Sequence, residues 1–116
     1  MILSLFSTLA FAGALDGKTF TATLTDPQKK ADPDTLTFAA DQFEAAACTK
    51  YGFAKSAYTA TQAGDAWKVT VDQVSATEGK THWALTVTGT HIEGSMDWTK
   101  TGQAAIHYTV SGDIHK

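Results

Sequence analysis

Apolar and polar residues alternate along most of this chain with a period of two. In Lys18–Thr25, for example, Phe20, Ala22 and Leu24 fall on one face and threonines on the other. Alternation over five to nine residues is typical of a strand that is buried on one side only. The pattern predicts eight strands and no helix, over Lys18–Thr25, Thr35–Ala39, Gln42–Ala47, Ala57–Gln62, Ala66–Asp72, Thr81–Thr88, His91–Thr99 and Gln103–Ser111.

Short connections between these strands would pair apolar faces with apolar faces, as a stable hairpin requires. Two-residue loops are predicted at Ala40-Asp41, Ala63-Gly64 and Gly89-Thr90, and a three-residue loop at Lys100–Gly102. The resulting pairs are Phe38 with Phe43, Ala60 with Trp67, Tyr58 with Val69, Val87 with Ile92, Leu85 with Gly94, Trp83 with Met96, Trp98 with Ala104 and Met96 with Ile106. The longer connections Asp26–Asp34, Cys48–Ser56 and Gln73–Lys80 would all lie at the opposite end. This order predicts an all-β fold, an eight-stranded antiparallel up-and-down barrel with a mouth at one end.

The predicted interior is aromatic and uncharged. Small residues lie between the large ones, and they either let a dry core interdigitate or leave room for an apolar ligand. Without a titratable group, such an interior is a poor place for acid–base catalysis. The charged, proline-containing stretch Asp26–Asp34 is predicted to be a solvated loop, either a lid over the mouth or a passive connector. The inward aromatic residues are Phe20, Phe38, Phe43, Tyr58, Trp67, Trp83, Trp98 and Tyr108.

Length, charge and cysteine content narrow the class of protein. The 116 residues are enough for one domain, which we assign to residues 13–116. The net charge is −3, and the chain has lysines but no arginine. No guanidinium group is therefore present to form bidentate hydrogen bonds with phosphate or a base edge, which argues against nucleic-acid binding. The single cysteine excludes an intramolecular disulfide and a cysteine-rich zinc site. No cofactor-binding motif is recognisable.

The first twelve residues differ from the rest of the chain. Residues 1–12 are apolar and uncharged and end in Ala10-Phe11-Ala12, a small-x-small site that a signal peptidase could cut. The run is too short to span a membrane. We expect a signal peptide, truncated at its basic start, and therefore a periplasmic or secreted protein. The alternative is a first strand or buried arm of the mature protein.

Two groups of side chains are candidates for chemistry. On the predicted register, the outer face brings together His82, Asp97 and His107. These side chains could bind a metal ion, or they could form an ordinary solvated surface. A solvated face is the preferred interpretation, so neither a metal site nor a catalytic residue is assigned. Cys48 has lysines but no histidine near it in sequence, and we expect a buried structural thiol, with an intermolecular disulfide as the alternative.

The segment Leu15–Phe53 contains the run Ala47-Cys48-Thr-Lys-Tyr51-Gly52-Phe53 after a phenylalanine-containing strand. With this run as its most specific element, the chain resembles small secreted lipocalin-like (calycin-type) β-barrel proteins of bacteria whose function is uncharacterised, over most of residues 13–116. The chain also has the closing Gly94-Ser-Met-Asp-Trp98 segment, but no Gly-x-Trp on its first strand. The resemblance implies a calyx, a location in the cell envelope and an unspecified ligand.

These patterns together predict a binding protein rather than an enzyme. A small, mostly apolar or aromatic ligand would lie between the loops Asp26–Asp34 and Cys48–Ser56. The alternative is a non-catalytic structural or protein-interaction module with a solid core, and a metalloenzyme using His82, Asp97 and His107 is a third hypothesis. The expected ligand contacts are Leu24, Leu36, Tyr58, Trp98 and Tyr108.

Overall fold

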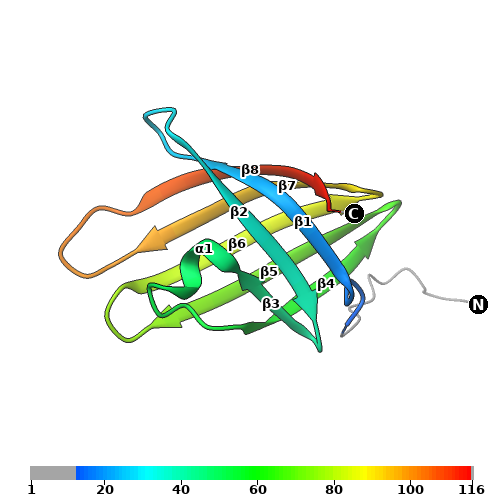
Figure 1. The fold of residues 1–116 in the computed structure, drawn as a ribbon, viewed down its shortest axis with the longest axis horizontal. Coiled ribbons are helices and arrows are strands. Elements are labelled where there is room, and N and C mark those ends of the chain that lie inside the picture. The colour runs from blue at the N-terminus through cyan, green and yellow to red at the C-terminus, as the bar shows by residue number, and fades with distance from the viewer. Residues whose placement is uncertain (1–12, 116) are drawn as a thin grey trace, which may run out of the picture.

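The computed structural model describes residues 13–115, which form a closed barrel of eight antiparallel strands in sequence order (Figure 1). The first and last strands pair with each other along Phe20–Thr25, which closes the wall. The all-β, up-and-down prediction is therefore confirmed. The elements are β1 (Lys18–Thr25), β2 (Ala31–Ala39), β3 (Gln42–Ala45), α1 (Ala46–Thr49), β4 (Ser56–Ala63), β5 (Ala66–Ser75), β6 (Gly79–Thr88), β7 (His91–Thr99) and β8 (Ile106–Ile114).

The two ends of the barrel differ, as the loop lengths predict. The predicted connection Gln73–Lys80 is wrong in its length, however, because β5 continues to Ser75 and β6 begins at Gly79. One end, the turn end, carries the two-residue turns 40–41, 64–65 and 89–90 together with residues 13–17. The other, the loop end, carries the connections 26–30, 46–55, 76–78 and 100–105. In Figure 1 the β5–β6 and β7–β8 connections of the loop end lie at the left, and the β4–β5 and β6–β7 turns of the turn end lie at the right.

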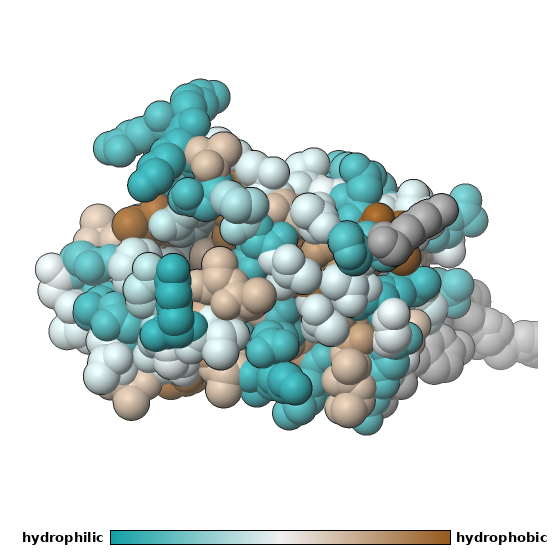
Figure 2. All heavy atoms as spheres, viewed as in Figure 1, coloured by the Kyte–Doolittle hydropathy of each residue, from teal (hydrophilic) through white to brown (hydrophobic). Residues whose placement is uncertain are grey.

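Alternation along the strands places the apolar face inside. Alternate positions of β5 and β6 are buried, and their neighbours are exposed. Figure 2 accordingly shows an outer wall of mostly hydrophilic and intermediate residues, with only small isolated hydrophobic spots. Threonine suits the outer positions because its branched side chain fits the pleated surface.

Two of the predicted hairpin registers are confirmed and two are wrong by two residues. Phe38 pairs with Phe43, and the β6–β7 turn keeps all three predicted pairs. In the β4–β5 hairpin, however, the turn is Gly64-Asp65 and Ala60 pairs with Val69. Gly64 takes a φ of 63° at the first central position of this turn, a conformation that costs glycine least.

The connection between β7 and β8 is longer than predicted. It covers residues 100–105, so that Trp98 pairs with Ile106 and Met96 with Tyr108. A shift of two residues keeps the same side chains inside, because side chains alternate with period two. The burial pattern therefore cannot distinguish the two registers.

Two predictions for the region around β2 and β3 are wrong. Residues 31–34 form the start of β2 rather than a loop. β3 ends at Ala45 instead of the predicted Ala47, and the short helix α1 begins at Ala46. The start of β2 pairs with β1 on one side, while β3 pairs with it only from Leu36 onward. Pro33 is tolerated there because proline fits a strand where no ladder hydrogen bond is needed from its nitrogen.

Aromatic rings fill the half of the barrel nearer the turn end. Phe38 contacts Phe43 and Tyr58 with ring centroids 5.2 and 4.9 Å apart, and Phe43 meets Trp83 at 5.0 Å. Buried Leu15, from the segment before β1, covers this cluster and packs against it. The half of the barrel nearer the turn end is therefore a packed core.

Tyr58 fastens the segment 13–17 to the barrel. Its hydroxyl accepts a hydrogen bond from the backbone nitrogen of Leu15 at 2.9 Å and donates one to Oδ1 of Asp16 at 2.9 Å. Burial raises the pKa of Tyr58 to about 12, so the hydroxyl keeps the proton that it donates.

The β2–β3 turn is strained, and relieving the strain should stabilise the protein. Ala40 and Asp41 both have positive φ, 52° and 64°, which is unfavourable for residues with a Cβ. We expect Ala40→Gly to raise the free energy of unfolding by about 0.5–1 kcal/mol, after the entropy that glycine loses on folding is subtracted. Urea unfolding measures the change. Ala39→Gly, one residue earlier in extended β2, is the control and should be destabilising; equal effects of the two variants would contradict the account.

Candidate functional site

A cavity of about 580 Å³ opens at the loop end of the barrel. Its size lies within the range of small-molecule sites, which is about 300–1,000 Å³. Its wall combines an apolar and aromatic part with several charged side chains. The lining residues are Leu24, Lys30, Asp32, Pro33, Asp34, Ala47, Cys48, Lys50, Tyr51, Phe53, Glu78, Thr81, Met96, Trp98 and Tyr108.

The apolar part of the wall comes from strand positions that point inward near the loop end. Leu24 lies near the end of β1, Met96 and Trp98 lie on β7, and Tyr108 lies on β8. Leu24 and Met96 are buried, whereas the two aromatic rings are half-buried. The alternation that fills the half of the barrel nearer the turn end therefore lines the cavity at the loop end with half-buried aromatic rings.

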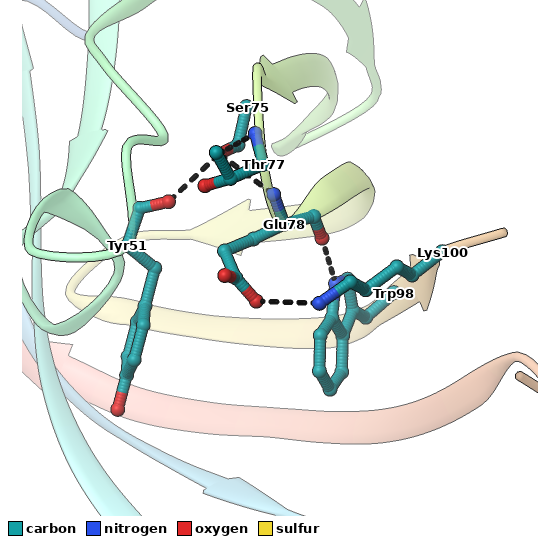
Figure 3. Close-up of polar contacts among 6 residues, drawn as sticks. All are labelled: Tyr51, Ser75, Thr77, Glu78, Trp98 and Lys100. Atoms are coloured by element: carbon teal, nitrogen blue, oxygen red, sulfur yellow. Dashed lines mark hydrogen bonds and ion pairs between the residues drawn. The ribbon is translucent and has the colours of Figure 1, made fainter. Parts of the chain in front are cut away.

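Hydrogen bonds from Ser75 and Glu78 fix the rim (Figure 3). Ser75 Oγ donates to the carbonyl oxygen of Tyr51 at 2.8 Å and accepts the backbone N–H of Glu78 at 3.1 Å. Trp98 Nε1 donates to the carbonyl oxygen of Glu78 at 2.6 Å, and Lys100 forms an ion pair with the Glu78 carboxylate at 3.1 Å. In Figure 3 the rings of Tyr51, from segment 46–55, and Trp98, from β7, both point downward, below these hydrogen bonds. The rim is thereby built from segments 46–55 and 76–78 together with β7.

Asp34 places a carboxylate inside the barrel, which corrects the prediction of an uncharged interior. On β2 it pairs with inward-facing Ala22, and only 6% of its surface is exposed. Oδ1 accepts the backbone N–H groups of Thr35 and Ala47, both at 2.8 Å. Oδ2 is buried and has no hydrogen-bond partner among the described residues.

Burial dominates the electrostatics of Asp34. Loss of water raises the pKa of its carboxyl group, and the backbone N–H groups of Ala47 and Thr35 offset only part of this rise. The ionised form of Asp34 is thus less favourable in the folded barrel than in the unfolded chain.

This imbalance predicts a pH-dependent stability. Because the folded-state pKa is raised, the ionised carboxylate destabilises the fold above that pKa, and the penalty disappears as pH falls toward 3.8. Asp34→Asn keeps the Oδ1 acceptor and removes the charge. We expect the stability of Asp34→Asn relative to the wild-type protein to be higher at pH 7 than at pH 4, because only the wild-type protein loses stability as its carboxyl group ionises; thermal unfolding from pH 3.5 to 8 measures this difference. If the stability difference between variant and wild type were the same at both pH values, or less favourable to the variant at pH 7, the raised pKa of Asp34 would be contradicted.

Cys48 is a free thiol on α1 that lines the cavity. Burial, followed by the negative charge of Asp34, raises its pKa to about 12. A thiol with that pKa is almost entirely protonated at neutral pH and is a poor nucleophile. The protonated, half-buried thiol is compatible with the structural role that we expected for it.

The reactivity of Cys48 is therefore expected to be low. The raised pKa lowers the thiolate fraction about a thousandfold, and the higher nucleophilicity of a basic thiolate recovers part of that loss. Alkylation by iodoacetamide at pH 8 should be about 30- to 60-fold slower in the folded protein than in the urea-unfolded chain. Rates within about threefold of each other would show that Cys48 is an ordinary exposed thiol.

The five predicted contact residues divide between two regions. Leu24, Trp98 and Tyr108 line the cavity. Leu36 is fully buried in the core, and Tyr58 holds the segment 13–17 at the turn end. Whether the first three contact a ligand stays a prediction.

Most of the lining residues were not among the predicted contacts, and Asp34, Phe53 and Met96 are three of them. Asp34 is the more instructive omission, because Asp34, Leu36 and Phe38 continue one period-two series. The charges and prolines around Asp34 made this part of β2 look like a loop.

The outer histidines are paired with carboxylates of neighbouring strands. His82 contacts Asp72 at 2.7 Å and His107 contacts Asp97 at 2.6 Å, so the two imidazoles do not share one carboxylate. Hydrogen bonds to Asp113 and Glu93 raise the pKa of exposed His91. Within residues 13–115, no three side chains of the metal-binding types lie close enough together to hold an ion.

Fold and cavity together define the class: a closed, eight-stranded antiparallel barrel of calycin-like architecture with a cavity at one end. No protein-family model, curated protein sequence or solved structure matches the chain. Kinship with small secreted lipocalin-like proteins thus stays a prediction from sequence. Between residues 13 and 115, no helix is long and apolar enough to cross a membrane.

Proposed function

We propose that the protein binds a small, largely apolar or aromatic molecule in the cavity at the loop end and performs no catalysis. The observation that carries the proposal is the cavity itself, about 580 Å³ above a packed aromatic layer. Preformed cavities of this size with an apolar wall and a few polar groups are the usual form of small-molecule sites. The protonated Cys48 thiol supports binding rather than nucleophilic chemistry.

We further propose that the protein acts outside the cytoplasm, after cleavage behind Ala12. The basis is the apolar segment 1–12, which lies outside the described residues. In a cell fractionation experiment, the mature protein should be found in the periplasm or the medium with Gly13 at its N-terminus. Full-length protein retained in the cytoplasm would overturn this part of the proposal.

Tryptophan fluorescence tests the binding proposal. The chain has three tryptophans: Trp98 lines the cavity, Trp83 lies in the core, and Trp67 lies near the turn end. Titration with oleate, cholesterol, 1-anilinonaphthalene-8-sulfonate and 2-(2-naphthyl)ethanol should give a saturable change for at least one probe, with one site per chain. A flat response across the panel would overturn the proposal and favour a structural or interaction module.

Two single substitutions locate the response. Trp98→Phe should remove most of the fluorescence change, whereas Trp67→Phe should retain it, because only Trp98 lines the cavity. A change that survives Trp98→Phe and is lost in Trp67→Phe would place the probe elsewhere.

A further inference from the structure

We propose that the natural ligand carries a protonated amine, and that this group pairs with Oδ2 of Asp34 while the apolar body of the ligand lies against Leu24, Met96 and Trp98. This inference rests on the proposed function and adds a substrate class to it. Its basis is that Asp34 lines the cavity and has one carboxylate oxygen without a partner; because this oxygen is covered in the described structure, the ammonium group would reach it after a small rotation of the side chain.

Asp34 is the inner of the two carboxylates that β2 contributes to this wall. Asp34 and Asp32 both line the cavity, but Asp32 is exposed, whereas Asp34 is 6% exposed and lies two residues further into the barrel along β2. Ala22, the partner of Asp34 on β1, is also buried. A ligand that extends from the rim into the barrel would therefore meet Asp34 with its inner end.

The hydrogen bonds of Asp34 define what its free oxygen needs. Thr35 and Ala47 supply two N–H donors, and both go to Oδ1. An ionised carboxylate is an acceptor only, so Oδ2 requires a donor. A buried polar atom without a partner is costly, and a donor that reaches it is correspondingly favoured.

The buried position of the Asp34 carboxylate, rather than the net charge of the wall, favours a cation at this point, because Lys30 and Lys50 balance the carboxylates of Asp32 and Asp34 in number. Asp32 adds a second carboxylate from the same strand, whereas the Glu78 carboxylate is already paired with Lys100. Lys30 and Lys50 also line the cavity, but neither forms an ion pair with Asp34 in the described structure. An ammonium group would make a charge-assisted hydrogen bond, about twice as strong as a neutral one.

The apolar surroundings suit the rest of such a ligand. Leu24 and Met96 supply aliphatic surface, and the rings of Trp98 and Tyr108 supply π faces that attract a nearby cation. A ligand with an aromatic or aliphatic body and one amine end satisfies both parts of the wall.

A matched pair of probes tests the inference. 2-(2-Naphthyl)ethylamine and 2-(2-naphthyl)ethanol share one body and differ in the end group, a cation at pH 7 in the first and a neutral hydroxyl in the second. Calorimetric titration of the wild-type protein should show at least about tenfold tighter binding of the amine, from the stronger hydrogen bond to a charged group. Equal or weaker binding of the amine would overturn the inference.

Two variants assign the preference to one oxygen. Asp34→Asn keeps the Oδ1 acceptor but replaces Oδ2 with a donor, so the amine preference should fall to about twofold or less while alcohol binding changes little. Asp32→Asn, two residues away on the same strand and exposed, is the control and should keep most of the preference. A preference that persists in Asp34→Asn, or an equal loss for both probes, would overturn the inference.

These outcomes separate the inference from the proposed function. If the wild-type protein binds the alcohol and the amine equally, the cavity is a binding site but Asp34 does not select an amine. If it binds neither these probes nor the wider panel, the proposed function itself fails.

Discussion

Trp83→Ala is expected to lower the free energy of unfolding by about 3–5 kcal/mol, the range for truncating a fully buried aromatic residue. Trp83 is completely buried, contacts the ring of Phe43, and donates from Nε1 to Oε1 of Gln73 at 3.0 Å. The substitution removes that hydrogen bond and leaves a large cavity in the aromatic layer. Urea unfolding at pH 7 measures the loss. For a domain of this size it is a large fraction of the total stability.

Tyr51→Ala is the control for this prediction. Tyr51 is also aromatic but is 53% exposed, and its hydrogen bond with Ser75 uses the backbone oxygen, which the substitution leaves in place. We expect a loss below about 1 kcal/mol, as for other exposed positions. Similar losses for the two variants would show that Trp83 is not a central core residue.

Gln73→Met is the second substitution with a large expected effect. Gln73 is fully buried, accepts hydrogen bonds from Thr81 Oγ1 and Trp83 Nε1 at 3.0 Å, and donates from Nε2 to the carbonyl oxygen of Ala54 at 3.0 Å. Methionine fills similar space but leaves these buried groups without their partner. We expect the free energy of unfolding to fall by about 2–4 kcal/mol, since unsatisfied buried polar groups are costly.

The same substitution should also disturb the binding site. Gln73 ties segment 46–55 to β5 through Ala54, and that segment contributes lining residues to the cavity. Probe affinity should therefore fall in Gln73→Met. The control is Gln62→Met on exposed β4 surface, which should change neither stability nor affinity. Unchanged stability of Gln73→Met would contradict the assignment of a buried polar network.

The barrel was predictable from sequence because alternation and turn residues agree with each other. In the β6–β7 hairpin, the apolar pair Val87 and Ile92 flanks a turn that begins with Gly89, so pattern and turn specify one register. In the β4–β5 hairpin, two turn positions compete, and both keep the same faces inside. Burial does not choose between them, and the backbone geometry around Gly64 does.

The candidate site was only partly predictable, because its polar part depends on contacts between distant segments. Leu24, Trp98 and Tyr108 follow from alternation near the loop end. Asp34 does not, since its burial depends on α1 packing beside the start of β2, where Ala47 donates to it across thirteen residues. A four-residue helix has no periodic signal in the sequence, so the element that buries Asp34 could not be foreseen.

The two interpretations of the interior that the sequence left open both describe part of the molecule. Interdigitated rings fill the half near the turn end, with Phe38 in contact with Phe20, Phe43 and Tyr58. The cavity occupies the half near the loop end. The aromatic contacts near the turn end stabilise the fold, and this stability offsets the cost of burying the Asp34 carboxyl group near the loop end.

A heteronuclear NMR titration tests the central claim most directly, that a small molecule binds in the loop-end cavity. Protein labelled with ¹⁵N gives one indole N–H signal for each of its three tryptophans, which Trp98→Phe and Trp67→Phe would assign. On addition of 2-(2-naphthyl)ethylamine, the signal of Trp98 should shift and saturate, because its ring lines the cavity, while that of Trp67 should stay in place. A Trp98 signal that does not move at millimolar probe, or one that moves no more than that of Trp67, would contradict the account.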